Sequence, residues 1–354
     1  MTAPCFLSGI QQIGVGVQDV DAFFAWSRRA FGTDIRIFED AGGAPLMARY
    51  TGGEVRSRRA LLAASLQGGG GLEIWQFTER APRAPSFEVQ LGDLGIFCPR
   101  IGTRDIGRAR EHFRLLGSPV TPAVRNPAGE EQFFLRDPAG RFWQAVETRE
   151  GWFSGGRHPT GGAAGCLVGV SDIDRSLRLY CDVLGYRRLV SDRRGTFADW
   201  AGLPGGRRAF RRVLLALEGK RPGAFGRLLG PSRIELVQAL DRRPRKIFAD
   251  RFWGDLGFIH VCFDVYGMDG MAEACRAAGF PFTVDSADAF AMGEAAGRFA
   301  YLEDPDGTLV ELVETRRLAV VRRWGWSLDL SRRDPRRPLP DLLVRLLALN
   351  RVRG

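Results

Sequence analysis

The sequence contains very little lysine. Of its 51 basic residues only Lys220 and Lys246 are lysines, so arginine carries almost all of the positive charge. The net charge is +10, but residues 316–354 hold eleven arginines and three aspartates, which places about +8 in that segment. The rest of the chain is close to neutral, and neither zinc-finger spacing nor an RNP-like aromatic strand accompanies the charge. We therefore expect no nucleic-acid partner.

Signals for secretion, membrane insertion and disulfide formation are also missing. No apolar run approaches the roughly 18 residues that span a bilayer, and residues 1–5 lack the start of a signal peptide. The six cysteines are scattered without a CxxC pair, which is typical of reduced thiols. The composition, 45% apolar and 26% charged, is that of an ordinary globular protein. These features predict a cytoplasmic protein, either a monomer or a homodimer.

Internal repeats are present at long offsets. The segment QDVD at residues 18–21 recurs 153 residues later as SDID at 171–174, and the same offset aligns Phe31-Gly32 with Leu184-Gly185. Both copies follow an alternating apolar run and precede apolar residues at helical spacing. This order predicts a strand, a helix that begins at aspartate, and a stop at glycine.

A second pair of segments repeats in the same way. GDLG at residues 92–95 matches residues 254–257, and RDPAG at 136–140 matches EDPDG at 303–307. Asp-Pro-x-Gly between apolar strands favours a hairpin turn. We therefore predict four βαβββ units at about residues 8–80, 90–150, 163–242 and 255–315. We expect units 1 and 2 to form one α+β domain (residues 1–154) and units 3 and 4 another (155–315), each an open, concave, eight-stranded mixed sheet.

Residues 8–315 resemble the vicinal oxygen chelate superfamily, which includes glyoxalase I, methylmalonyl-CoA epimerase, fosfomycin-resistance enzymes and the type I extradiol dioxygenases. In that superfamily, paired units form a U-shaped sheet around a metal ion. The ligands come from the first and the closing strand of each unit. The resemblance implies these positions, unit by unit: Gln12, Cys98, Gly165 and His260 on the first strands, and Glu73, Gln144, Glu235 and Glu311 on the closing strands.

With the expected pairing, the resemblance implies a metal site formed by Glu235, His260 and Glu311. One nitrogen and two carboxylates suit a divalent ion such as Fe, Mn, Zn, Ni or Co. Gly165 leaves the fourth position empty, and His158 on the linker is a candidate replacement. The other half, with two amides and a cysteine, is expected to be structural. The competing interpretations are a satisfied core histidine and carboxylates paired with arginine.

Residues 301–311 (YLEDPDGTLVE) are similar to the closing signature of extradiol dioxygenases, which implies a catalytic role for Tyr301. The second histidine ligand and the acid–base histidine of that family are absent. We therefore expect a lyase or isomerase of the glyoxalase or epimerase type, in which Glu235 or Glu311 moves a proton on a small hydrophobic or aromatic substrate. A non-haem Fe(II) dioxygenase and a non-catalytic binding or resistance protein remain alternatives. Residues 279–296 either line the cavity, through Phe280, Phe282, Phe290 and Met292, or belong to the core.

Residues 316–354 lie outside the resemblance. We expect this basic, amphipathic tail to fold back on the body, with Trp324, Trp326 and the apolar face of residues 342–349 buried. The alternative is peripheral attachment of the tail to an anionic membrane through arginine and tryptophan.

Overall fold

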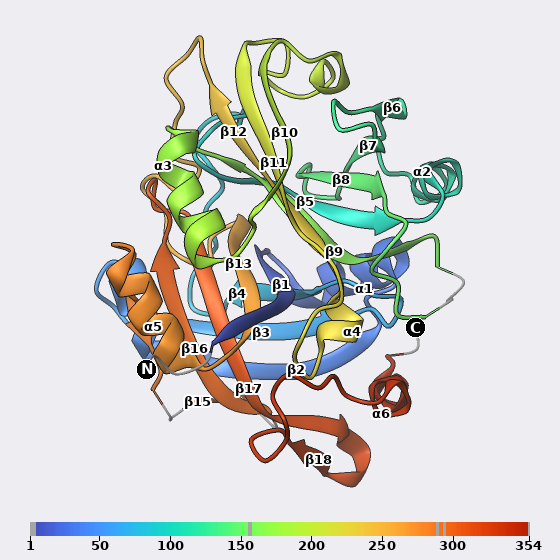
Figure 1. Cartoon of the computed structure of the whole chain (residues 1–354), viewed down its shortest axis with the longest axis vertical. Helices are drawn as coiled ribbons and strands as arrows, with labels where there is room; N and C mark the ends of the chain where they lie inside the picture. Colours follow the sequence, from blue (N-terminus) through green and yellow to red (C-terminus); the bar gives the residue numbers. More distant parts are fainter. Residues whose placement is uncertain (1–4, 155–157, 288–289, 293–294, 353–354) are drawn as a thin grey trace.

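The computed structural model describes residues 5–154, 158–287, 290–292 and 295–352, and it contains the four βαβββ units (Figure 1). Unit 1 consists of β1 (Phe6–Gly16), α1 (Val20–Phe31), β2 (Ile35–Gly43), β3 (Ser57–Ala64) and β4 (Gly71–Phe77). Unit 2 consists of β5 (Gly95–Thr103), α2 (Ile106–Leu115), β6 (Val124–Arg125), β7 (Glu131–Arg136) and β8 (Phe142–Glu147). The predicted α+β class and the repeated unit are confirmed.

The second half of the chain repeats this order with insertions. Unit 3 consists of β9 (Thr160–Gly169), α3 (Ile173–Leu177) with a following π-helical turn (Arg178–Val183), β10 (Arg188–Gly195), β11 (Phe210–Leu217), α4 (Gly226–Leu229) and β12 (Ser232–Ala239). Unit 4 consists of β13 (Gly257–Tyr266), α5 (Met268–Ala277), β14 (Val284–Asp285), β15 (Phe290–Met292), β16 (Ala295–Glu303) and β17 (Leu309–Val321). Short 3₁₀ segments lie at Pro45–Tyr50, Ala198–Trp200 and Arg322–Trp324, and a fourth follows in the C-terminal tail.

The local signals in the sequence act as predicted. The carboxylate of Asp19 caps α1 by accepting a hydrogen bond from the backbone N–H of Ala22 at 2.9 Å, and Gly32 ends the helix with φ of 65°. In the second hairpin turn the N–H of Gly307 donates to the carbonyl of Asp304 at 3.0 Å, and Gly307 has φ of 90°. Each of these contacts joins residues only a few positions apart in the chain. The residue types at those positions are therefore enough to predict them.

The pairing of the units differs from the expectation. One sheet has the strand order β14-β16-β17-β13-β1-β4-β3-β2, and the other has β10-β11-β12-β9-β5-β8-β7-β6. We call them sheet A and sheet B; β15 and β18 (Trp326–Asp329) attach to sheet A. Unit 1 thus pairs with unit 4, and unit 2 with unit 3, so the predicted pairing of neighbours is wrong. Each sheet draws strands from both sides of residue 154 and does not correspond to either expected domain.

A close glycine contact is found in both pairs of units. A Cβ atom on Gly16 of unit 1 would lie 1.9 Å from the carbonyl oxygen of Asp255 in unit 4. A Cβ on Gly169 of unit 3 would lie at the same distance from the carbonyl of Asp93 in unit 2. Asp93 and Asp255 belong to the two GDLG repeats, so each repeat packs on a glycine of its partner unit. The similarity of the two GDLG repeats shows that the units are related. It does not show which units pair in a sheet.

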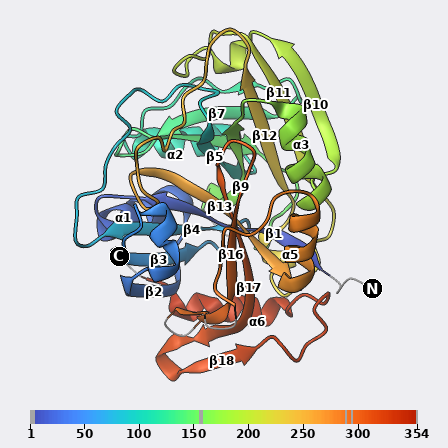
Figure 2. The same cartoon turned by 90° about the vertical axis from the view of Figure 1, so that its left-hand side faces the viewer.

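The two sheets share one apolar core. Trp143 of β8 meets Phe258 of β13 edge to face, with ring centroids 5.1 Å apart, and a single cluster of buried residues contains side chains of both sheets. Figure 2 shows sheet B in the upper part of the molecule and sheet A below it, with the C-terminal tail at the lower end. Among the described helices, none combines the length and apolar character needed to cross a membrane.

The tail packs on sheet A through part of the apolar face expected, but without the two tryptophans. It contains β18, α6 (Asp341–Leu346) and a 3₁₀ turn (Leu347–Asn350). Val344 and Leu347 are buried, whereas Leu342 and Leu349 on the same segment are exposed. Trp324 and Trp326 are 66% and 41% exposed, so their predicted burial is wrong. They lie at the turn between β17 and β18, where the hairpin extends beyond the body.

Candidate metal centre

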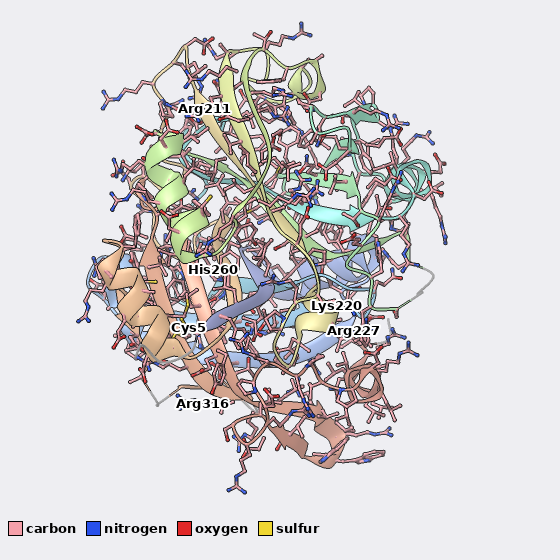
Figure 3. The ribbon with its side chains drawn as sticks, in the orientation of Figure 1. Cys5, Arg211, Lys220, Arg227, His260 and Arg316 are labelled. Carbon is pink, nitrogen blue, oxygen red and sulfur yellow. The ribbon has the colours of Figure 1, made fainter. Side chains whose placement is uncertain are left out.

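Four polar side chains converge in the middle of sheet A. They come from the adjacent strands β4, β1, β13 and β17, and all four are buried: Glu73, Gln12, His260 and Glu311. The Nε2 atom of His260 lies 3.1 Å from Oε2 of Glu311 and 3.3 Å from Oε2 of Glu73. The Nε2 atom of Gln12 lies 3.3 Å from Oε2 of Glu311. Figure 3 labels His260 near the middle of the molecule.

Strand β1 is adapted to admit the histidine. Its pairing with β13 shifts register between Ile10 and Gln12 and again between Gly14 and Val15. Gly14 lies opposite His260, and a Cβ atom on Gly14 would be only 2.3 Å from Cε1 of the imidazole. Because Gly14 has no side chain, the imidazole occupies the space above β1 and faces the carboxylates.

The donor atoms fit a divalent metal ion. One ligand atom from each of Glu73, His260 and Glu311 can be chosen so that all three lie within 4.8 Å of one another. Oε2 of Glu73, Nε2 of His260 and Oε1 of Gln12 are buried without a well-aligned hydrogen bond. Unpaired buried polar atoms are costly. Two carboxylates, an imidazole and an amide around one point would be satisfied by a divalent cation, whose charge the two glutamates balance.

The electrostatic environment of His260 favours its cation when no metal is bound. Burial lowers the pKa of the imidazole, but the charge of Glu311, with smaller contributions from Glu73, outweighs burial and raises this pKa from 6.5 to about 9. A proton therefore competes with a metal ion for the same nitrogen.

Tyr301 of β16 contacts the other nitrogen of the histidine. Its hydroxyl lies 3.4 Å from Nδ1 of His260, and burial, together with the charges of Glu311 and Glu73, raises the pKa of the hydroxyl well above its ordinary value. A tyrosine that stays protonated cannot serve as a base. It can accept a hydrogen bond from Nδ1–H, which leaves Nε2 free to bind a metal. The structure thus places the hydroxyl of Tyr301 beside His260 at this site.

A cavity of about 530 Å³ adjoins the centre and includes Gln12, Glu73, Glu311 and Tyr301 in its wall. Its size is in the range typical of small-molecule pockets. Most of the remaining wall is apolar, with contributions from Phe38, Met47, Trp75, Phe225, Leu228 and Leu347. Two arginines also line it: Arg58, which is ion-paired with Asp40 at 2.6 Å, and Arg317, which is exposed.

Glu235 lies in sheet B and is not part of this centre. Its carboxylate is 2.7 Å from Nε of Arg212 and 3.6 Å from Nη1 of Arg100, and all three side chains are buried. The assignment of Glu235 as a ligand of the His260 site is therefore wrong, and the arginine pairing that competed with it is correct. Glu73 takes its place, because unit 1 rather than unit 3 completes the sheet of unit 4.

The degenerate site is therefore in units 2 and 3. Gly165 leaves an empty position there, and a Cβ atom on Gly165 would lie 3.1 Å from Cδ of Arg100. The guanidinium of Arg100 also contacts Glu130 at 2.8 Å. Guanidinium groups already balance the charge of Glu235, so this half offers no comparable place for a metal ion. The expected structural half combined units 1 and 2, and that grouping is wrong because unit 1 pairs with unit 4.

The remaining candidates lie away from the centre. The ring of His158 is 5.0 Å from that of His112, and its Nε2 is 2.9 Å from the carbonyl oxygen of Arg29, so it is not a fourth ligand. Phe280 and Phe282 pack against the common core. The side chains of Phe290 and Met292 lie outside the described residues.

The positions that meet in sheet A are among those that the resemblance implies, but the expected pairing of units grouped them wrongly. Gln12 and Glu73 occupy the ligand positions of unit 1. The expected pairing of unit 1 with unit 2 groups them with Cys98 and Gln144, and that group is expected to be structural. The signal that distinguishes the groups is the set of ligand types that results from pairing unit 1 with unit 4. That set contains two carboxylates, one imidazole and one amide, without a gap.

Residues 162–312 match the family model described as the Glyoxalase/Bleomycin resistance protein/Dioxygenase superfamily. This match covers less than half of the chain, and it confirms the resemblance to the vicinal oxygen chelate superfamily for these residues. The matched segment contains His260 and Glu311 but not Gln12 or Glu73. No curated protein matches the sequence significantly.

Solved structures extend the fold to most of the chain. Glyoxalase I from Zea mays is 14% identical, with a TM-score of 0.52, and the match covers 88% of this chain and 92% of that one. A putative dioxygenase from Bacillus subtilis subsp. subtilis str. 168 is 14% identical, with a TM-score of 0.58, and the match covers 87% and 86%. At such low identity these structures show that the fold is shared.

Proposed function

We propose that this protein is a metal-dependent lyase or isomerase that moves a proton next to a polarised oxygen of a small substrate. The observation that carries the proposal is the buried set Gln12, Glu73, His260 and Glu311 beside a mostly apolar cavity. A divalent metal held by these residues would supply Lewis-acid polarisation of a carbonyl or enediolate oxygen. The family match and the shared fold support this class of reaction.

The chain offers two carboxylates for the proton transfer. Glu73 and Glu311 lie on the two strands that flank β1 and β13, so they approach the cavity from opposite sides. Oε2 of Glu311 has Gln12 as a hydrogen-bond donor, whereas Oε2 of Glu73 has no well-aligned donor. A carboxylate oxygen that accepts no well-aligned hydrogen bond keeps a lone pair for a proton. We therefore assign proton removal to Glu73, with Glu311 held in place by Gln12.

The surroundings of the base favour this role. Trp75, Trp253 and Tyr301 belong to one buried cluster beside the site, and all three also line the cavity. Such walls exclude water from the reacting carbon and strengthen the interaction between the carboxylate and the developing charge. His260 and Tyr301 contribute orientation, because the hydroxyl fixes which imidazole nitrogen faces the carboxylates.

The ligand set distinguishes this proposal from the dioxygenase alternative. Non-haem Fe(II) oxygenases use two histidines and one carboxylate. Within the described residues, His260 is the only histidine at the centre, since His112 and His158 contact each other elsewhere. One imidazole with two carboxylates and an amide suits Lewis-acid and base chemistry better than O₂ activation.

The test begins with the metal content of protein purified without chelator. We expect about one divalent ion per chain in the wild type, little in His260→Ala, and an unchanged amount in Glu235→Gln, the matched control in sheet B. Hydrogen exchange in D₂O is then followed by NMR on a panel of 2-oxygenated carbonyl compounds under anaerobic conditions. We expect metal-dependent exchange that Glu73→Gln abolishes. A reaction that requires O₂ would overturn the proposal in favour of the dioxygenase alternative.

A further inference from the structure

The cavity beside the metal centre is closed by a segment that lies outside the superfamily match. Leu318 and Leu347 line the cavity and are both buried, and Arg317 lies in the same wall. These residues belong to the C-terminal tail, beyond residue 312, where the family match ends. The tail therefore contributes to the site as well as to the surface of the molecule.

The cavity has two ends that differ in their surroundings. At the metal end, Tyr301 and Trp75 belong to a buried cluster around His260. At the other end, Leu228 of α4 joins the tail residues Leu318 and Leu347 in a separate buried cluster. The partly buried Phe225 packs against that second cluster and also lines the cavity, and Ile37, which lines the cavity too, packs against both clusters. The far end is therefore made of aliphatic and aromatic carbon.

Specific contacts attach the tail to both of its neighbours. The N–H of Leu339 donates to the carbonyl of Ala224 at 2.9 Å, and Asp341 forms an ion pair with Arg227 at 2.6 Å. These two contacts bind the tail to the segment that carries α4, at which Arg227 is labelled in Figure 3. Near the end of the chain, the N–H of Val352 donates to the carbonyl of Asp34, just before β2, at 2.9 Å. The tail thus joins two walls of the cavity that come from units 1 and 3.

We infer that the C-terminal tail is the specificity element of this site and that it selects substrates with an uncharged, apolar body. This inference rests on the proposed function, because it concerns the part of the substrate that extends away from the metal. An oxygen-bearing end meets Glu73, Glu311 and the metal position, while the body lies among Phe225, Leu228 and Leu347. A substrate with a charged group at that end would lose its hydration without gaining a partner.

The charged residues of the cavity agree with this assignment. Arg58 is neutralised by Asp40, and a backbone carbonyl, that of Gly42, also accepts from it. Arg317 is exposed and borders the cavity from the hairpin. The apolar end therefore excludes charged groups, and a polar substrate substituent is accepted only toward the metal or toward solvent.

The test uses the uncharged fluorescent probe N-phenyl-1-naphthylamine with the full chain. We expect the wild type to bind it, and Leu347→Asn to bind it about tenfold more weakly, because an amide replaces an apolar contact. Leu342→Asn is the matched control: it changes the neighbouring turn of the tail at an exposed position outside the cavity, and its affinity should equal that of the wild type. Thermal unfolding confirms that each variant is folded.

If Leu347→Asn does not fold, a second variant at the same position tests the inference. Leu347→Phe keeps the tail apolar but takes up cavity space, so it should weaken binding of this probe by several-fold and leave the smaller 2-naphthol bound. The inference is overturned if the wild type does not bind the probe, if both Leu347 variants bind it as the wild type does, or if Leu342→Asn weakens binding equally. The metal content is measured in parallel. If the wild type binds no metal but the variants change probe affinity as expected, the proposed function alone is refuted. If the wild type binds metal but neither Leu347 variant changes probe affinity, the specificity role alone is refuted.

Discussion

Metal binding to this site should release a proton from His260. In the metal-free protein the pKa of the imidazole is about 9, since Glu311 and Glu73 stabilise the cation more than burial destabilises it. At neutral pH the side chain is therefore an imidazolium, which has no lone pair to donate. A divalent ion can bind Nε2 only after that proton leaves.

The size of the effect follows from the pKa. Below about pH 9 the apparent metal affinity should fall about tenfold for each pH unit, so the affinity at pH 7 should be about 100-fold lower than its limit at high pH. Titration calorimetry with Co²⁺, in two buffers of different ionisation enthalpy at the same pH, gives the number of protons released. We expect about one at neutral pH. An affinity that does not change between about pH 7 and pH 8.5, with no proton released, would refute this electrostatic account of the site.

The raised pKa of His260 also predicts how the stability of the metal-free protein depends on pH. The folded-state pKa of about 9 is above the ordinary value of 6.5, so the contribution of His260 to stability is fully present below about pH 6.5 and is lost as the pH rises through 9. The difference corresponds to at most about 3 kcal/mol. Urea unfolding of chelator-treated protein across this window should show the decline, and His260→Gln should remove it. A wild-type stability that stays constant from about pH 6.5 to pH 9 would contradict the shift.

Four substitutions test the remaining parts of the structure. Glu73→Gln should lower turnover by about 10²–10⁴-fold, as for loss of a general base, and kinetics in metal-saturating buffer separate this from weaker metal binding. Gly14→Ala places a methyl group where the imidazole of His260 lies, so metal content by mass spectrometry should fall while circular dichroism shows a folded chain. Tyr301→Phe should weaken metal affinity by about 10-fold or more, because the orienting hydrogen bond is lost; an unchanged affinity would remove Tyr301 from this role. Glu235→Ala leaves two buried arginines without their shared carboxylate and should cost about 3–5 kcal/mol in urea unfolding without changing metal content.

Short-range features of this molecule could be predicted from residue types. The helix that starts at Asp19 and stops at Gly32, and the turn from Asp304 to Gly307, form through contacts between residues only a few positions apart. His260 and Glu311 were also predicted as ligands, because the resemblance to the vicinal oxygen chelate superfamily implies ligands on the first and closing strands of each unit. The exposure of Trp324 was predicted wrongly, because composition does not show how far a hairpin extends from the body.

The ligand set as a whole depended on which units meet. The repeat in the sequence determines that four similar βαβββ units exist and which strand position in each unit faces inward. It does not determine whether Glu73 or Glu235 joins His260, because both occupy the same place in their units. Contacts between residues more than two hundred positions apart, such as the approach of Gly16 to the backbone of Asp255 and the pairing of β1 with β13, hold unit 1 against unit 4. Glu73 consequently lies near an imidazole and an amide, whereas Glu235 lies between two arginines. These neighbours meet only in the assembled sheets, so the sequence alone does not show them.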